Sequence, residues 1–279
     1  MSSNPSDGEC HPTLHNLLRL DNRTIIVTGG LGSLGTCLSS ALLHHGADVI
    51  IFDLPLEADP KHLEQIRQEA SNPPSNLHYI HCNAISEASV TSAFTTASSL
   101  ARHPIRGLIT CAGISGNCPA VDYPITDFRR IIDINVTGSF LCARAAAQIM
   151  HRQQSSGSIV MVASMSGTNV NRGVDTTPYN ASKSAVLQLA RNLAAEWGND
   201  GIHPPIRVNT LSPGYILTPM TVPTFEERPG LKTLWPDGNM LGRMSNVEEY
   251  RSAVVFLLSD GNSYMTGSDL RIDAGHCAW

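Results

Sequence analysis

The stretch TIIVTGGLGSLG, residues 24–35, decides the fold of this chain. It begins with β-branched and apolar residues, which are typical of a buried strand, and continues with Gly30, Gly32 and Gly35 at the spacing G-x-G-x-x-G. Such a turn between a strand and a helix lets backbone N–H groups and the helix N-terminus approach a pyrophosphate, because no side chain is in the way. A glycine pattern alone also fits a plain strand–helix turn. With the strand before it and a helix after it, the stretch predicts a dinucleotide site.

The next predicted strand, VIIFDL, places Asp53 near its end, 18 residues after Gly35. A carboxylate at this point can accept hydrogen bonds from the ribose hydroxyls of an adenosine. It would also repel a 2′-phosphate, and neither the glycine-rich turn nor Leu54 offers a Lys or Arg to neutralise that charge. The sequence therefore favours NAD(H) as the coenzyme and leaves NADP(H) open.

Short apolar runs alternate with helical stretches from residue 24 to the C-terminus. The predicted strands cover residues 24–28, 48–52, 78–82, 107–111, 158–162, 206–210 and 270–272, and the predicted helices cover 34–45, 60–70, 86–101, 124–153, 178–198 and 246–258. Apolar strands separated by helices are typical of a parallel sheet covered on both faces. The sequence therefore predicts one α/β domain over residues 21–279, after a flexible arm over 1–20 with a short helix around 14–20.

One segment, about residues 212–246, breaks this alternation. It is rich in proline and contains large apolar side chains. A loop of this length in a compact domain is usually a lid or a binding segment. We expect it to close over a substrate, with an apolar lining drawn from Ile216, Leu217, Phe225, Leu231 and Trp235. Packing of the lid on the core is the alternative interpretation of these side chains.

The composition of the 279 residues excludes several classes of protein. The formal net charge of −5 gives no basic surface for nucleic acid, and no apolar run approaches the length that spans a bilayer. The first 20 residues lack the basic start and apolar centre of a secretion signal. Seven cysteines without a C-x-x-C pair indicate free thiols in a reducing compartment. We therefore expect a cytoplasmic protein that acts on a small molecule.

Residues Tyr179 and Lys183 stand four apart at the start of a predicted amphipathic helix, PYNASKSAVLQLARNLAAEW. This spacing places a phenol and an ammonium on the same helix face. A free phenol has a pKa of about 10, and a nearby ammonium favours its ionised form and lowers that pKa. The pair therefore indicates a group that exchanges a proton with an alcohol or a carbonyl oxygen. A tyrosine packed in the core beside a surface lysine is the structural alternative.

Three polar residues upstream strengthen this interpretation. The predicted strand GSIVMV is followed by Ser164 and Ser166, either of which can hydrogen-bond the same substrate oxygen. Asn135 lies inside a long predicted helix, where an amide can disturb the helical hydrogen bonds and hold a water on a proton path to Lys183. A simple helix-surface position is the alternative for Asn135.

Several of these motifs occur in one order along the chain. They are residues 28–35, the turn Cys111-Ala112-Gly113, Asn135-Val-Thr-Gly138, Ser164, Tyr179-x-x-x-Lys183, Ser212-Pro213-Gly214 and the tail TGSDLRIDAG. Over about residues 22–275 the sequence resembles the compact, single-domain short-chain dehydrogenases/reductases, and its SMSG and YNASK segments are most similar to fungal polyol, ketose and tailoring reductases. The resemblance implies a Rossmann-type doubly wound parallel sheet. It also implies an oxidoreductase that transfers a hydride between a nicotinamide cofactor and a secondary alcohol or ketone.

The resemblance also implies roles for individual residues. Ser164 would polarise the substrate oxygen, Tyr179 would act as acid and base, Lys183 would modulate Tyr179 and bind a ribose, and Asn135 would hold a relay water. Ser164 is preferred to Ser166 because the serine of the family lies three residues before a glycine, here Gly167. The implied coenzyme-binding residues are Gly29, Gly32, Ser33, Leu34, Gly35, Asp53, Asn83, Ala112, Gly113, Tyr179, Lys183, Pro213, Gly214, Ile216 and Thr218. The implied substrate-binding residues are Ser164, Tyr179, Phe225 and Trp235.

Three departures from the family pattern keep other functions open. Ser33 stands where the compact branch has a glycine, the turn before Gly113 reads Thr110-Cys111-Ala112, and Asn83 replaces an expected Asp. The glycine spacing is that of the extended epimerase and dehydratase branch, so an NAD-using epimerase, dehydratase or isomerase without net redox change is one alternative. A coenzyme-binding scaffold that has lost turnover is another, against which intact Ser164 and Tyr179 argue.

The resemblance further implies a homotetramer or homodimer built on helices 124–153 and 178–198, with the tail 276–279 reaching a neighbouring subunit. We expect no metal site. His78, His81 and Cys82 have metal-like spacing but lie on a predicted buried strand whose alternate residues face opposite ways. His44 and His45 end a helix, where a cation is favoured by the helix dipole. Cys111 and Cys118 have no His in register and are not expected to act as nucleophiles.

Overall fold

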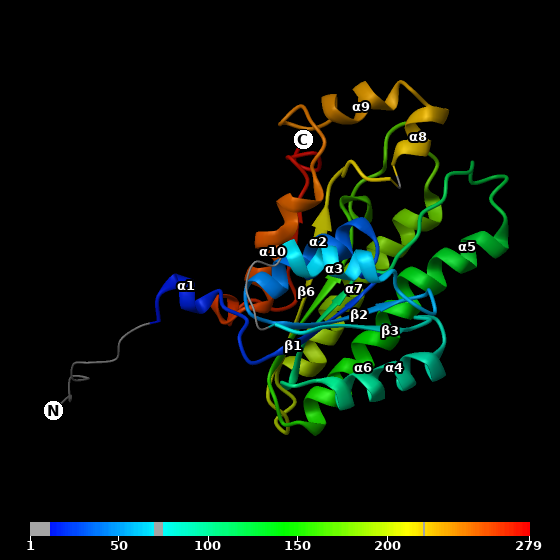
Figure 1. The fold of residues 1–279 in the computed structure, drawn as a ribbon. Coiled ribbons are helices and arrows are strands. Elements are labelled where there is room, and N and C mark those ends of the chain that lie inside the picture. Colours follow the sequence, from blue (N-terminus) through cyan, green and yellow to red (C-terminus); the bar gives the residue numbers. More distant parts are fainter. Residues whose placement is uncertain (1–11, 70–74, 220) are drawn as a thin grey trace.

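Seven parallel strands form one sheet in the part of the chain that the computed structural model describes, residues 12–69, 75–219 and 221–279 (Figure 1). Their order across the sheet is β3-β2-β1-β4-β5-β6-β7. The strands are β1 Thr24–Thr28, β2 Asp48–Asp53, β3 Leu77–His81, β4 Ile105–Thr110, β5 Gly157–Val162, β6 Ile206–Pro213 and β7 Asp269–Ile272. This is the doubly wound Rossmann-type arrangement that the sequence predicts.

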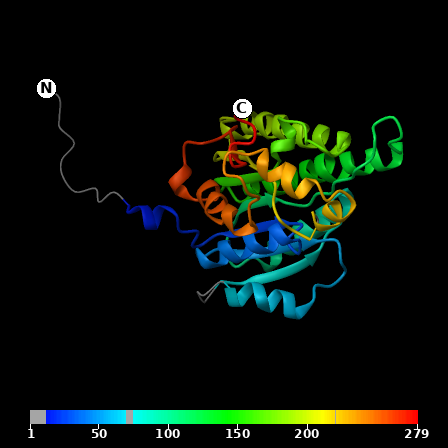
Figure 2. The same cartoon turned by 90° about the horizontal axis from the view of Figure 1, so that it is seen from above.

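Helices cover both faces of this sheet. One face is covered by α2 Ser33–His44, α3 Pro60–Glu69 and α10 Arg251–Leu258. The other is covered by α4 Glu87–Leu100, α6 Ser139–Arg152 and α7 Thr177–Gly198 (Figure 2). Successive residues of β1 alternate between the two hydrophobic cores, with Ile25 and Val27 in one and Ile26 in the other. The apolar character of every strand position follows from this burial on both sides.

Strand β1 is the point at which the order of the sheet reverses, since β2 lies on one side of it and β4 on the other. In open α/β sheets such a reversal leaves a crevice at the carboxyl ends of the strands, where the outgoing turns diverge. The turns after β1, β2, β4, β5 and β6 all end at this edge, and the helices α8 Val222–Glu227 and α9 Leu231–Asp237 lie beyond it (Figure 1). The fold therefore places a site at this edge of the sheet.

The structure differs from the sequence prediction in several boundaries. The predicted helix 124–153 is divided into α5 Ile125–Ile132, a π-helical segment η1 Asp133–Gly138, and α6. The predicted helix 246–258 begins as a 3-10 turn, η3 Val247–Tyr250, before α10. The predicted segment 212–246 is not a plain loop, because it contains α8 and α9. The shorter elements are η2 Met165–Gly167 and η4 Asp260–Asn262.

The predicted N-terminal arm is only partly described. Its residues 1–11 lie outside the described residues, and its helix is α1 Leu14–Leu17, at the side of the molecule (Figure 2). Leu20, the last residue of the predicted arm, is fully buried, so the chain joins the core within the predicted arm. Among the described helices, none has the length and apolar character needed to cross a bilayer.

Candidate active site

A cavity of about 1110 Å³ opens at the carboxyl edge of the sheet. Its wall is made by the turns after six strands, β1 to β6, and by the first residues of α2 and α7. The predicted coenzyme-binding residues all lie in this wall, although they are scattered over the sequence. They are Gly29, Gly32, Ser33, Leu34, Gly35, Asp53, Asn83, Ala112, Gly113, Tyr179, Lys183, Pro213, Gly214, Ile216 and Thr218.

The glycine-rich turn is shaped by close backbone contacts. Gly29 has a φ of +64°, and a Cβ there would lie 2.7 Å from the Cα of Ala112. A Cβ at Gly35 would collide with the carbonyl oxygen of Gly29. Gly32 caps α2 and offers no side-chain acceptor to the first N–H groups of that helix. These free donors and the positive end of the helix dipole suit a pyrophosphate, so the residues present fit a dinucleotide.

Asp53 ends β2 beside this turn. One carboxylate oxygen accepts the Leu31 N–H at 2.9 Å and the other accepts the Leu54 N–H at 2.8 Å. The two bonds fix the carboxylate at the cavity wall, while each oxygen keeps a second lone pair for a ligand hydroxyl. Within the described wall, the cationic side chains are Arg130 and Lys183, and neither belongs to the turns beside Asp53.

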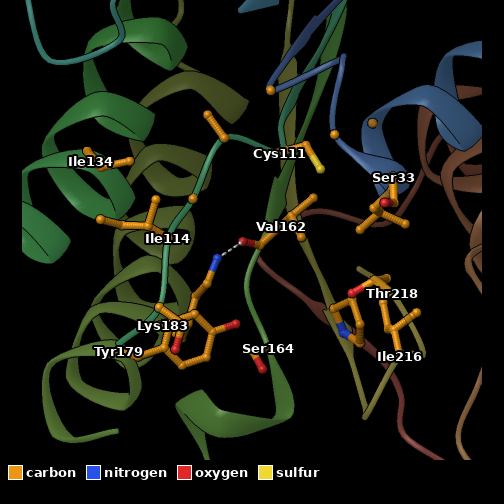
Figure 3. A pocket seen from close by; sticks show the side chains of 18 of the residues that line it. Ser33, Cys111, Ile114, Ile134, Val162, Ser164, Tyr179, Lys183, Ile216 and Thr218 are labelled. Carbon is orange, nitrogen blue, oxygen red and sulfur yellow. Dashed lines mark hydrogen bonds between the residues drawn. The ribbon is translucent and has the colours of Figure 1, made fainter. Parts of the chain in front are cut away.

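Ser164, Tyr179 and Lys183 come together on the other side of the cavity (Figure 3). Ser164 follows β5 and caps η2, where its hydroxyl accepts the Ser166 N–H at 3.1 Å. Tyr179 and Lys183 lie on the first two turns of α7. The Lys183 ammonium donates to the Val162 carbonyl at 2.8 Å, and its Nζ lies 5.7 Å from the centroid of the Tyr179 ring. Ser33 and Thr218 face this group across the cavity (Figure 3).

The electrostatics of this group differ from the expectation. Burial raises the pKa of the Tyr179 phenol above its usual value, although a hydrogen bond with Ser164 acts in the opposite direction. Burial also lowers the pKa of Lys183 to about 8. The lysine lies over the ring and bonds to Val162, so the predicted lowering of the phenol pKa by Lys183 does not occur in the protein alone. A positive charge added at the site would lower the pKa of the Tyr179 phenol, which is the predicted direction.

Asn135 lies in the π-helical segment, one layer behind the cavity wall. Its Oδ1 accepts the Ile114 N–H at 2.9 Å, and its Nδ2 donates to the Ile114 carbonyl at 3.0 Å and to Ser182 Oγ at 2.9 Å. Ser182 Oγ in turn donates to the Tyr179 carbonyl at 2.7 Å. The expected disturbance of the helix is confirmed. Both N–H groups of the amide bond to protein, so the side chain links the turn after β4 to α7.

The lid contains a small aromatic core. The rings of Tyr215 and Trp235 stack with their centroids 4.2 Å apart, and Phe225 packs on Trp235 at 5.2 Å. Trp235 and Ile216 lie in the cavity wall, as expected. Phe225 and Leu231 are buried inside the lid core and Leu217 is exposed, so these three do not form the predicted lining. The structure therefore corrects Phe225 from a substrate-facing to a lid-packing side chain, because Trp235 lies above it.

Several wall residues carry no signal in the sequence. Ile114, Ile134, Asn117, Arg130 and Asn171 line the cavity, yet none belongs to a recognised motif. They come from the turn after β4, from α5 and η1, and from the loop between η2 and α7. Only the folding of these loops around the start of α7 brings them to the wall.

The remaining histidines and cysteines lie as follows. His81 Nδ1 lies 3.2 Å from the Pro55 carbonyl, and burial raises the pKa of the Cys111 thiol to about 11, which disfavours a nucleophilic thiolate. One group in the described part of the chain has metal-ligand chemistry, namely His151, Asp200 and His203. Its histidine rings stack 3.9 Å apart, and none of its members lies in the cavity wall.

Comparison with known proteins agrees with this geometry. A family model described as enoyl-(acyl carrier protein) reductase matches residues 29–276. The short chain dehydrogenase/reductase notP' of Aspergillus versicolor is 48% identical over 275 residues, covering 99% of this chain and 94% of that protein. D-arabinitol 2-dehydrogenase [ribulose-forming] of Candida tropicalis is 36% identical over 270 residues, covering 94% of each chain.

Two solved structures have the same fold. The crystal structure of gox2181 has a TM-score of 0.86 at 37% identity and covers 94% of this chain and 98% of its own. The NADPH-dependent 3-quinuclidinone reductase of Rhodotorula rubra has a TM-score of 0.82 at 28% identity, with both chains fully covered. The chain belongs to the short-chain dehydrogenase/reductase family. It is an NAD(P)-dependent oxidoreductase of secondary alcohols and ketones.

Proposed function

We propose that Tyr179 transfers the proton, Ser164 holds the reacting oxygen and Lys183 positions the coenzyme ribose beside them. The observation that carries the proposal is the meeting of these three side chains in the wall of one cavity, opposite the glycine-rich turn. The coenzyme supplies or accepts the hydride when it is bound. The chain's own groups orient the oxygen and exchange its proton, and the lid excludes water.

Ser164 is better placed than Ser166 for this role. The Ser164 side chain lies beside Tyr179 in the cavity wall (Figure 3), and its Oγ lies 3.1 Å from Ser166 Oγ. Ser166 also lines the cavity, but its N–H and its hydroxyl both bond to Ser164. We therefore assign Ser164 to the substrate oxygen and Ser166 to the support of Ser164. Asn135 supports the start of α7 through Ser182, and we place the relay water near the Lys183 ammonium.

The coenzyme favoured by this site is NAD(H). Asp53 presents a fixed carboxylate where the adenosine ribose would bind, and no described cation in the wall stands beside it. A negative charge there repels a 2′-phosphate, so NADP(H) should bind less tightly. The similar 3-quinuclidinone reductase of Rhodotorula rubra is NADPH-dependent, and the preference for NAD(H) in this chain is proposed from Asp53.

The function is tested by following the absorbance of the reduced coenzyme. The assay uses both coenzymes and a panel of polyols, ketoses and bulky ketones. We expect turnover with secondary alcohols or ketones and a preference for NAD(H). Asp53→Ala should erode that preference by removing the repulsion. Tighter binding of NADPH than of NADH to the unaltered protein, measured by calorimetry, would contradict the coenzyme assignment. Epimerisation without net redox change would contradict the reaction.

We further infer a homotetramer or homodimer in the cytoplasm. The family resemblance supports the assembly, and the six described cysteines, none of which forms a disulfide, support a reducing compartment. The tail is not free to reach far, since His276 packs edge-on against Tyr215 and Trp279 Nε1 donates to the Gly238 carbonyl at 3.3 Å. In this tail Ala278 and the Trp279 ring are exposed, and the Trp279 ring is the larger surface that could contact a neighbouring subunit. Light scattering on the purified protein gives the oligomeric state.

A further inference from the structure

The entrance to the cavity beside Tyr179 is built from three segments that are bonded to one another. The loop after η2 donates and accepts main-chain hydrogen bonds through Asp175, whose N–H reaches Asn117 Oδ1 at 2.8 Å and whose carbonyl accepts the Cys118 N–H at 3.0 Å. The lid bonds to the same loop, since Arg228 pairs with Asp175 at 3.2 Å and Trp235 Nε1 donates to the Arg172 carbonyl at 3.1 Å. This entrance therefore has a defined shape.

Two carboxamides in this entrance, Asn117 and Asn171, are held in one orientation. The carbonyl oxygen of Asn117 accepts the Asp175 N–H, and a backbone donor cannot be exchanged for an acceptor. The carbonyl oxygen of Asn171 accepts Asn180 Nδ2 at 3.2 Å, and the same Nδ2 donates to the Asn169 carbonyl at 3.0 Å, which fixes it as the nitrogen end of the Asn180 amide. Each amide must therefore present its NH₂ group away from its protein partner.

Neither NH₂ group has a hydrogen-bond partner among the residues that the structure describes. Both side chains line the same cavity as Ser164 and Tyr179. A fixed donor without a protein acceptor at a cavity wall is suited to an acceptor atom of a ligand. The two amides thus offer two donors at the end of the cavity where the substrate enters.

The charges at this end indicate what kind of acceptor is suited to them. Among described wall residues here, the only charged side chain besides the buried Lys183 is Arg130, which is exposed on α5 and screened by water. Two carboxylates lie near this end but outside the described cavity wall: Asp175 is paired with Arg228, and Asp127, in a smaller pocket that it shares with Asn117 and Arg130, is exposed. The amide donors are neutral and match uncharged hydroxyl or carbonyl oxygens.

We propose that Asn117 and Asn171 form a substrate-reading pair that donates hydrogen bonds to uncharged oxygen atoms flanking the reacting carbon. The proposal rests on the proposed function, because it takes Tyr179 as the reacting end of the cavity. The pair selects substrates with further neutral oxygens over simple ketones. Such oxygens occur both on a polyhydroxy chain and on a larger carbonyl compound such as a keto-lactam.

Steady-state reduction of four ketones tests the pair: ribulose, 2,4-piperidinedione, cyclohexanone as the reference without further oxygens, and 5-ketogluconate as the acid. The variants are Asn117→Asp and Asn171→Asp, which keep the oxygen that holds the loop and replace the donor by an acceptor. Asn169→Asp is the matched control, because it adds the same charge to the loop that carries Asn171, from a side chain outside the cavity wall. Calorimetry of NADH binding checks that each variant still binds coenzyme.

We expect the unaltered enzyme to prefer ribulose or 2,4-piperidinedione to cyclohexanone. A preference for ribulose identifies a polyhydroxy chain as the substrate, and a preference for 2,4-piperidinedione identifies a larger carbonyl compound. Each Asp variant should lower kcat/KM for that ketone by about tenfold or more and change cyclohexanone by less than about twofold. A parallel loss for both ketones, no loss for either, or a preference for cyclohexanone or 5-ketogluconate overturns the proposal. Failure to reduce any ketone despite NADH binding would overturn the proposed function itself, and the pair with it.

Discussion

Lys183 shows how a residue of the proposed site can lower the stability of the fold. Its ammonium is buried, bonds to the Val162 carbonyl and lies over the Tyr179 ring. Burial penalises the charged form, which is why the pKa of Lys183 is lowered to about 8. In the unfolded chain the lysine is exposed to water and keeps its ordinary pKa. The buried charge therefore lowers the free energy of unfolding most at a pH below about 8, where Lys183 is charged in both states.

The sign of this effect gives a prediction for Lys183→Met. Between pH about 8 and the ordinary lysine value of 10.5, the unfolded chain binds the proton more tightly than the folded one. The free energy of unfolding of the unaltered protein, relative to Lys183→Met, should therefore rise across this window by about 3 kcal/mol. Urea denaturation of both proteins at matched pH values measures the difference. A difference that is flat or falls with pH would show that Lys183 is not buried as a cation.

The chemistry of single residues could be predicted from the sequence only in part. The spacing of Tyr179 and Lys183 requires that they share a helix face, and they do. The direction of the phenol pKa could not be predicted, because it depends on how completely the surrounding loops bury the ring. Asn117 and Asn171 were also beyond prediction, since their orientation is set by Asp175 and Asn180 in the folded loop.

At the level of elements, the π-helical segment is the feature that joins the two halves of the site. Each π-type turn holds one extra residue, so Asn135 leaves the regular helix pattern and points toward Ile114 and Ser182. The amide thereby holds the turn after β4 against the start of α7, where Tyr179 lies. Loss of this side chain leaves buried backbone groups of Ile114 without partners.

We expect Asn135→Ala to lower the free energy of unfolding by about 1–3 kcal/mol, because the Ile114 N–H and carbonyl lose their partners. The same change should lower kcat, since Tyr179 loses the support that reaches it through Ser182. Asn192→Ala, on the exposed side of α7, is the matched control. If the two variants unfold at the same urea concentration and turn over at the same rate, Asn135 is not the link described here.

Most elements could be predicted from apolar runs and turn residues, whereas three features could not. Asn135 indicates a disturbance of the helix over 124–153, but the π-helical form and the extent of η1 could not be predicted, because no glycine or proline stands where η1 begins. The lid helices α8 and α9 are short and contain prolines, which read as loop signals. The sequence predicts that Phe225 lines the cavity. Its burial against Trp235 could not be predicted, because this contact forms only when the lid folds.

In the molecule as a whole, the order of strands brings distant residues to one edge. The turns after β1, β2 and β3 make the half that suits the nucleotide, and those after β4, β5 and β6 make the half with Ser164 and Tyr179. The fold class and the position of the cavity could be predicted because alternating strands and helices allow few other arrangements. The closure of the lid on the loop after η2 could not, since it depends on the ion pair of Arg228 with Asp175.

The central claim is that the Tyr179 hydroxyl exchanges the proton of the reacting oxygen at the meeting point of these halves. Tyr179→Phe removes that hydroxyl and keeps the ring over Lys183. Turnover of the best alcohol or ketone should fall by about a thousandfold or more, because the lost step is general acid–base catalysis, while NADH still binds in calorimetry. Retention of most of the rate, with coenzyme bound, would contradict the account.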